Sequence, residues 1–135
     1  LDIVEFIQNN GCDIKNDLEQ LWKRIIFNIL ISNTDDHLRN HGFLLTSQGW
    51  KLAPAFDINP SIDKSGLSLN IDMNSNDLDI ELAKSIGTYC SLSIAQMNGI
   101  INEIKLVVSN WKKEAKSIEI PKDEISIMQN AFYLS

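Results

Sequence analysis

The sequence predicts a single, mainly helical α+β domain over residues 1–135 with one short β-hairpin. Two patterns support this prediction. Apolar residues recur at intervals of three and four in several long segments, which is the period of an amphipathic helix. One pair of apolar runs is separated by a polar turn closed by glycine, which indicates a hairpin. With 44% hydrophobic residues, a chain of 135 residues is long enough to bury its own core.

Two helices are predicted at the start of the chain. The first covers residues 1–8 and ends at the polar run Asn9–Gly11. The second begins near Asn16, because Asn16 and Glu19 have the spacing of a capping box. A serine–asparagine pair ends this helix and passes the chain to a polar loop. Its wide apolar face, which predicts burial on most of one side, consists of Leu18, Leu21, Trp22, Ile25, Ile26, Ile29 and Leu30.

A hairpin is predicted next, with strands over residues 42–45 and 50–52 and a turn at 46–49. A proline then ends the second strand, and Asp57 follows in a loop. The hairpin therefore lies between Asn40 and Asp57 and can fold these two residues back toward each other.

The rest of the chain is predicted to be mostly helical. An extended segment is expected over residues 67–73, where apolar and polar residues alternate. A helix over residues 78–86 should stop at Gly87, and a longer helix, opening with a capping box, should cover residues 94–115. The last helix should begin near Pro121.

Composition narrows the possible partners. The net charge of −6 argues against direct binding to nucleic acid, which needs a basic surface, but leaves a basic protein partner open. No apolar run approaches the roughly 20 residues of a membrane span. The first residues do not resemble a signal peptide. Cys12 and Cys90 are isolated in the sequence, so we expect free thiols.

The chemistry is concentrated in the motif N-T-D-D-H-L-R-N at residues 33–40 and in Asp57 beyond the hairpin. An acid, an amide five positions later and a second acid are the residue types that phosphoryl transfer needs. Asp35 can accept a proton from a hydroxyl group. Asn40 and Asp57 can hold magnesium against the phosphates of a nucleotide.

Other interpretations of this loop are open. Asp and Asn are common in turns, so the Asp35–Asp36 pair alone would carry little weight. His37 and His41 could hold a transition metal if the segment were helical, and together with Asp35 and Asp57 they could form a metal-dependent hydrolase site. An orienting role for His37 within the loop fits better, because Gly42 and the asparagines disfavour a helix here. Ser32 and Thr34 lack the surroundings of a nucleophile.

The segments F-N-I-L-I-S-N-T-D-D-H-L-R-N-H-G-F-L-L and G-W-K-L-A-P-A-F-D-I-N-P-S resemble the C-terminal domain of the HipA-like serine/threonine kinases, the toxins of bacterial toxin–antitoxin modules. The likeness is specific over residues 1–61 and weaker to residue 131. It implies a helical domain like the C-terminal lobe of a kinase, with a short hairpin carrying the metal-binding loop.

The resemblance also implies roles for single residues. Asp35 matches the catalytic aspartate, and His37 matches a histidine that recurs in this loop. Asn40 and Asp57 match the two residues that bind Mg²⁺ and, through it, ATP. The position of Asp36 need not be acidic for this mechanism.

The sequence has no G-x-G-x-x-G loop and no V-A-I-K-like strand to hold a nucleotide. By resemblance, an N-terminal nucleotide-binding lobe supplies these parts, so we expect this chain to be the catalytic half of a kinase, with little or no activity alone. A degenerate lobe that only binds a partner is the alternative. Resemblance further implies a bacterial cytoplasmic location, an aminoacyl-tRNA synthetase as protein substrate, and a HipB-like DNA-binding antitoxin.

Overall fold

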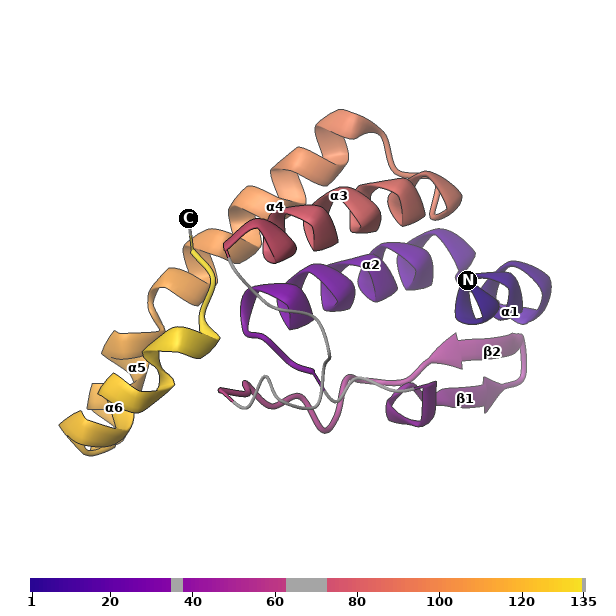
Figure 1. Ribbon diagram of the computed structural model, residues 1–135. Helices are drawn as coiled ribbons and strands as arrows, with labels where there is room; N and C mark the ends of the chain where they lie inside the picture. The colour runs from indigo at the N-terminus through magenta and orange to yellow at the C-terminus, as the bar shows by residue number, and fades with distance from the viewer. Residues whose placement is uncertain (35–37, 63–72, 135) are drawn as a thin grey trace.

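The computed structural model describes residues 1–34, 38–62 and 73–134, and within them the fold is mainly helical with one two-stranded antiparallel sheet (Figure 1). This confirms the predicted α+β class. The elements, in chain order, are α1 Asp2–Asn10, α2 Ile14–Leu30, the 3-10 turn η1 Leu38–Asn40, β1 Phe43–Thr46, β2 Gly49–Leu52, α3 Met73–Tyr89, α4 Ile94–Ser109, α5 Trp111–Ser117, α6 Lys122–Met128 and the 3-10 turn η2 Gln129–Ala131.

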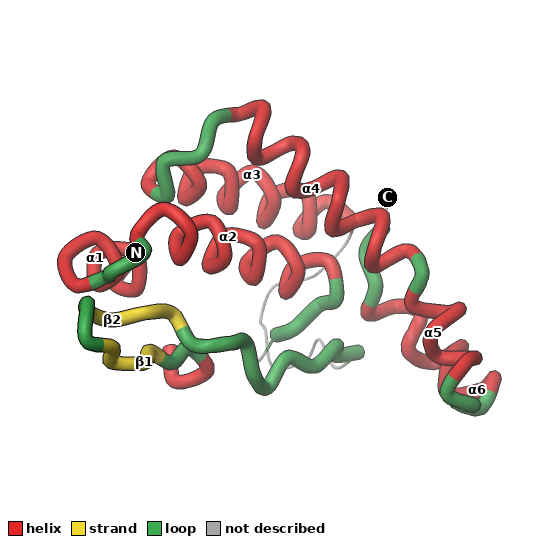
Figure 2. Tube along the Cα trace, turned by 180° about the vertical axis from the view of Figure 1, so that it is seen from behind, coloured by secondary structure: helices red, strands yellow, loops and turns green. Residues whose placement is uncertain are grey.

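Helix α2 runs through the middle of the molecule (Figure 1). One of its sides packs against α3 and α4, while the hairpin and the irregular segments lie on the other, as the view from behind also shows (Figure 2). Trp22, Ile26 and Leu30 of α2 are each fully buried. The Trp22 indole N–H also donates a hydrogen bond of 2.7 Å to the Ala83 carbonyl of α3. Apolar burial and one directed bond together fix α2 against α3.

Gly87 lies inside α3 and does not end the helix, so the predicted stop was wrong. A Cβ atom at this position would collide with Met97 Sδ and lie 2.9 Å from Trp22 Nε1. The glycine is therefore explained by the close approach of α3 to its neighbours, which outweighs the roughly 1 kcal/mol that glycine costs within a helix.

The hairpin lies where it was predicted, but its turn is shorter than the predicted 46–49, because β1 covers Phe43–Thr46 and β2 covers Gly49–Leu52. Phe43 pairs with Leu52 and Thr46 with Gly49, which leaves Ser47 and Gln48 as the turn. Gly49 has a φ of +128°, which a side chain would rarely tolerate. The hairpin is joined to the end of α1 by an isolated parallel bridge between Gly11 and Trp50.

Other predicted boundaries need correction. Helix α2 begins at Ile14 after Asp13, so the capping box predicted at Asn16 is wrong. Helix α3 begins at Met73, which was predicted to be extended, whereas residues 67–72 lie outside the described part of the chain.

The C-terminal helices also differ partly from expectation. The helix predicted over residues 94–115 is interrupted at Asn110 and forms α4 and α5. Its capping box is confirmed, because the Gln96 backbone N–H donates to Ser93 Oγ and the Ser93 backbone N–H donates to Gln96 Oε1. Pro121 is the N-cap of α6.

Both cysteines are free thiols, as predicted. Cys12 is exposed, whereas Cys90 is buried, and burial raises the pKa of the Cys90 thiol to about 11. In the described part of the chain, no helix is both long and apolar enough to cross a membrane.

Candidate functional site

A polar stripe on α2 faces the hairpin side of the molecule. Asp17, Arg24 and Asn28 are spaced by seven and four positions, which places them on one face of the helix. Asp17 Oδ2 accepts a 2.9 Å hydrogen bond from the Leu52 backbone N–H at the end of β2. Arg24 Nη2 donates to the Ala53 carbonyl. These two contacts hold the chain as it leaves the hairpin and runs toward Asp57.

The loop that follows α2 is fixed at its start by Asn28, the third residue of the polar stripe. The Asn33 backbone N–H donates to the Asn28 carbonyl over 2.8 Å, and the Asn33 side chain donates to Asn28 Oδ1 over 3.1 Å. Ser32, which comes before Asn33, has a φ of 55° in the left-handed region. The Ser32 carbonyl accepts a hydrogen bond from the Ser61 N–H. The chain therefore turns sharply after α2 and is joined there to the segment beyond Asp57.

Asn40, a predicted magnesium ligand, ends the 3-10 turn η1 and is only 7% exposed. It lines a cavity of about 10 Å³, close to the volume that one water needs. Two further lining residues, Phe56 and Ile58, are the immediate neighbours of Asp57. The structure thus brings Asn40 to the segment that carries Asp57, as the hairpin position predicted.

Asp57, the other predicted magnesium ligand, has a φ of 56° and an exposed side chain. Asp is among the few residue types that adopt this conformation at modest cost. Asn59 Nδ2 donates a 3.1 Å hydrogen bond to Asp57 Oδ1 and restricts the carboxylate. The left-handed backbone and this hydrogen bond together restrict the direction in which the Asp57 carboxylate points.

Asp35, Asp36 and His37 lie outside the described residues, so the predicted catalytic pair Asp35 and His37 remains a prediction. His41 is partly buried and lines the same cavity as Asn40. Within residues 1–34, 38–62 and 73–134, no three His, Cys, Asp or Glu side chains are grouped as a metal site requires. The oxygen atoms of Asn40 and Asp57 are of the type that Mg²⁺ prefers.

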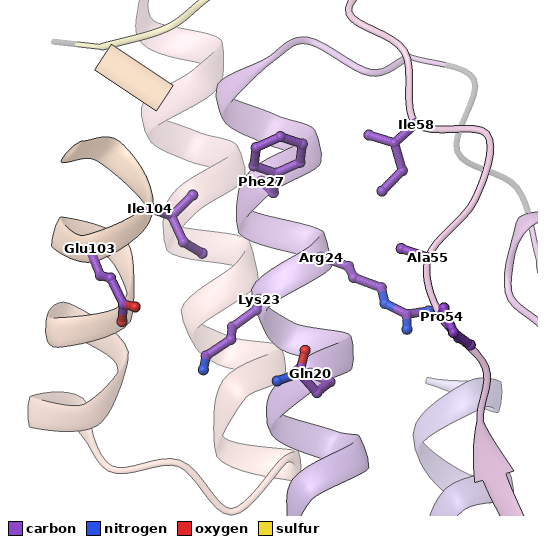
Figure 3. Close-up of a pocket in the computed structure, with 9 residues that line it drawn as sticks. All are labelled: Gln20, Lys23, Arg24, Phe27, Pro54, Ala55, Ile58, Glu103 and Ile104. Atoms are coloured by element: carbon purple, nitrogen blue, oxygen red, sulfur yellow. The ribbon is translucent and has the colours of Figure 1, made fainter. Parts of the chain in front are cut away.

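A larger groove of about 390 Å³ lies behind the Asp57 segment, between α2, α4 and residues 54–58 (Figure 3). Phe27, Ile58 and Ile104 form much of its apolar lining. Its two cationic side chains already have partners, because Lys23 pairs with Glu19 at 2.9 Å and Arg24 bonds to Ala53. The groove is therefore lined by apolar side chains together with three charged ones, Lys23, Arg24 and Glu103.

Arg24, Ala55 and Ile58 line both the groove and the small cavity at Asn40. These three residues form a thin wall between the two spaces. The segment carrying Asp57 is thus supported by α2 on one side and open to the groove behind it.

Sequence reasoning missed the supporting residues Asp17, Arg24 and Asn28, although a signal for them was present. They are polar residues recurring on one face of α2, and Asp17 and Asn28 are buried. Buried polar side chains have hydrogen-bond partners as a rule, so this stripe could have predicted contacts to the hairpin and to the loop.

The fold and the cavity define a mainly helical domain in which Asn40 and the segment that carries Asp57 meet beside the central helix α2. The sequence model of the HipA-like C-terminal domain matches residues 1–111, and the chain belongs to this family. It is a HipA-like, kinase-related domain, and its family is associated with the kinase toxins of toxin–antitoxin modules. Neither the search of curated proteins nor the search of solved structures found a match.

Proposed function

We propose that this chain is the catalytic C-terminal lobe of an ATP- and Mg²⁺-dependent protein serine/threonine kinase of the HipA-like class. The observation that carries the proposal is the convergence of Asn40 with the neighbours of Asp57 at one cavity, in a chain of this family. Buried Asn40 and left-handed Asp57 provide two oxygen ligands from separate, anchored loops.

In this proposal, each residue of the loop has a separate role. Asp35 accepts the proton of the substrate hydroxyl group, and His37 orients the loop around it. Asn40 and Asp57 hold Mg²⁺, which neutralises negative charge on the phosphates of ATP. Asn59 keeps the Asp57 carboxylate directed through its hydrogen bond, so little orientation is lost when the ligand binds.

We propose that residues 1–135 alone transfer phosphate slowly or not at all. The sequence contains neither a glycine-rich phosphate loop nor a strand carrying a phosphate-pairing lysine, so a separate N-terminal lobe would supply them. Magnesium held by one or two protein groups binds weakly by itself. The substrate would be a protein, with an aminoacyl-tRNA synthetase as the family precedent, and a DNA-binding antitoxin would be the regulatory partner in the bacterial cytoplasm.

Metal and nucleotide binding can be tested separately from turnover. Mn²⁺ replaces Mg²⁺ in such sites and broadens the NMR signals of nearby amides. With millimolar Mn²⁺ and ATP, we expect broadening in ¹⁵N-labelled chain at residues 38–41 and 56–59. The Asp57→Asn variant should lower the apparent affinity for Mn²⁺–ATP, measured from this broadening, at least tenfold. The substitution removes the charge of one ligand, while asparagine still tolerates a left-handed backbone.

The matched control is Asp123→Asn, which removes an equal charge from an exposed position on α6. Broadening that is unaffected by Asp57→Asn, or that is lost equally in the control, would refute the metal site. Broadening that needs no nucleotide and strengthens with Zn²⁺ would favour a metal-dependent hydrolase instead.

Turnover is measured with radiolabelled ATP, Mg²⁺ and serine- and threonine-containing peptides. We expect the isolated chain to stay near background. Turnover comparable with that of an intact kinase would contradict the proposal that a second lobe is needed. Absence of nucleotide binding in every form of the protein would favour an interaction module without catalysis.

A further inference from the structure

The last residues of the chain return to the end of α2, close to the start of the candidate catalytic loop (Figure 1). The Tyr133 backbone N–H donates a 2.7 Å hydrogen bond to the carbonyl of Leu30, the last residue of α2. A helix leaves its last four carbonyls without partners inside the helix, and this bond satisfies one of them. Ala131 is fully buried, and Phe132 and Tyr133 pack against the core.

Residues of α5 contact the segment at residues 129–134 that returns toward α2. The rings of Trp111 and Phe132 are stacked, with centroids 4.0 Å apart and planes 6° apart. Lys112 Nζ donates a 2.8 Å hydrogen bond to Gln129 Oε1. Stacked aromatic pairs contribute beyond the area that they bury, so these contacts fix where residues 129–134 run.

The end of α2 determines the direction in which the chain enters the loop. Ile31 is buried, and Ser32 then turns the backbone through the left-handed region. Two distant backbone donors hold this turn: Tyr133 bonds to Leu30 on one side of it, and Ser61 bonds to Ser32 on the other. Without the first of these donors, the turn would keep the bond from Ser61 and the local Asn28–Asn33 contacts but would lose its link to the segment at residues 129–134.

We propose that residues 129–134 form a positioning element for the loop that carries Asp35 and Asn40, with Phe132 and Tyr133 as its positioning residues. These residues lie beyond residue 111, where the match to the HipA-like domain ends. The part of the proposal that concerns nucleotide binding rests on the proposed kinase function. The part that concerns loop order stands on the contacts alone.

The first test removes a single hydrogen-bond donor. Proline at position 133 has no N–H, and the extended conformation of Phe132 (φ −94°, ψ 117°) suits a following proline. Tyr133→Ala removes the same side chain but keeps the N–H, so it is the matched control. The readout is amide hydrogen exchange at Asn33 and Ser61, whose N–H groups are bonded at the turn.

We expect exchange at these two amides to be roughly five- to tenfold faster in Tyr133→Pro than in Tyr133→Ala, the size expected for one backbone hydrogen bond. Exchange at Met97, in α4, should be the same in both variants. Equal exchange at Asn33 and Ser61 in both variants, or an equal acceleration at Met97, overturns the positioning role.

The second test uses Phe132→Ala, which removes the ring stacked on Trp111. Ile127→Ala is its control, because Ile127 is an exposed residue on α6. The apparent affinity for Mn²⁺–ATP should fall several-fold in Phe132→Ala and stay unchanged in Ile127→Ala, with urea denaturation recorded for both. If the wild type binds Mn²⁺–ATP measurably, equal affinity in wild type, Phe132→Ala and Ile127→Ala overturns the positioning role. If exchange responds as expected while even the wild type binds no Mn²⁺–ATP, the positioning role is supported and the kinase proposal fails.

Discussion

The two sides of α2 are built on different principles. Toward α3 and α4, fully buried apolar side chains such as Trp22 and Ile26 pack against other apolar residues. Toward the hairpin and loops, the Asp17 and Arg24 side chains make hydrogen bonds to single backbone groups, and the Asn28 side chain accepts one from the Asn33 side chain. Apolar burial is strong but has no direction, whereas a hydrogen bond is weaker and fixes the position of one atom. The first side holds the fold together, and the second places the site.

This difference can be expressed in free energies. Full burial of a large apolar side chain contributes about 1.5–3 kcal/mol, whereas a typical hydrogen bond contributes about 0.5–1.5 kcal/mol net. Substitutions on the apolar side of α2 should therefore change stability most. Substitutions in the site segment should change stability least and ligand binding most.

The largest effect is expected for Trp22→Ala. The substitution leaves a cavity between α2 and α3 and removes the donor to the Ala83 carbonyl. We expect the free energy of unfolding, measured by urea denaturation, to fall by about 3–5 kcal/mol. Such a loss could unfold the chain, so Trp22→Phe is the graded control: it keeps a ring and loses the hydrogen bond. A loss below about 1 kcal/mol for Trp22→Ala would contradict the importance of this side of α2.

An intermediate effect is expected for Asp17→Ala, at the junction of α2 and the hairpin. Both Asp17 and Leu52 are buried, so the Leu52 N–H would lose its partner away from water. We expect a loss of about 1–3 kcal/mol in the same measurement. Asp13→Ala is the matched control, because Asp13 is exposed and its side chain accepts a long 3.3 Å bond from Asn16. Equal losses of unfolding free energy in the two variants would show that stability depends on negative charge near the start of α2 and not on the bond to β2.

The smallest effect on stability is expected at Asp57. Asp57→Asn should change the free energy of unfolding by less than about 0.5 kcal/mol, because the side chain is exposed and Asn tolerates a left-handed backbone. Asp57→Val should lose about 1–2 kcal/mol, because a β-branched residue is strained at this φ. Identical stability of the two variants would mean that the left-handed conformation is not required in solution.

Much of the fold could be predicted because local patterns and tertiary contacts agree there. The hairpin is an example, since its polar turn, its glycine and its apolar runs all favour the observed register. The local sequence pattern gave wrong helix boundaries where a tertiary contact determines the structure. Gly87 stays within α3 because Trp22 and Met97 pack against it, and no local signal reports on such distant residues.

The break at Asn110 illustrates the same limit. The apolar spacing of Val108 and Trp111 continues across it, so periodicity predicts one helix. In the structure, Trp111 stacks on Phe132, which lies about 20 residues further along the chain, and α5 begins as a separate helix at Trp111.

The candidate site was predictable in composition but only partly in geometry. The spacing of Asn40, the hairpin and Asp57 correctly predicted that the two loops meet, and the cavity at Asn40 confirms this meeting. The left-handed backbone of Asp57 and the anchoring bonds from Ser61 and Arg24 could not be predicted, because they depend on where separate segments come together. Asp35 and His37 lie outside the described residues and remain predictions.

The bond between Tyr133 and Leu30 has a consequence for the timing of synthesis. A ribosome adds about 5–20 residues per second, and Tyr133 follows Leu30 by about 100 residues, so α2 emerges roughly 5–20 s before the residue that caps its end. During that interval the nascent chain already contains residues 33–40 and Asp57. The turn after α2 still lacks the hydrogen bond from Tyr133 to Leu30. The turn is therefore completed only after Asp35, Asn40 and Asp57 have all been made.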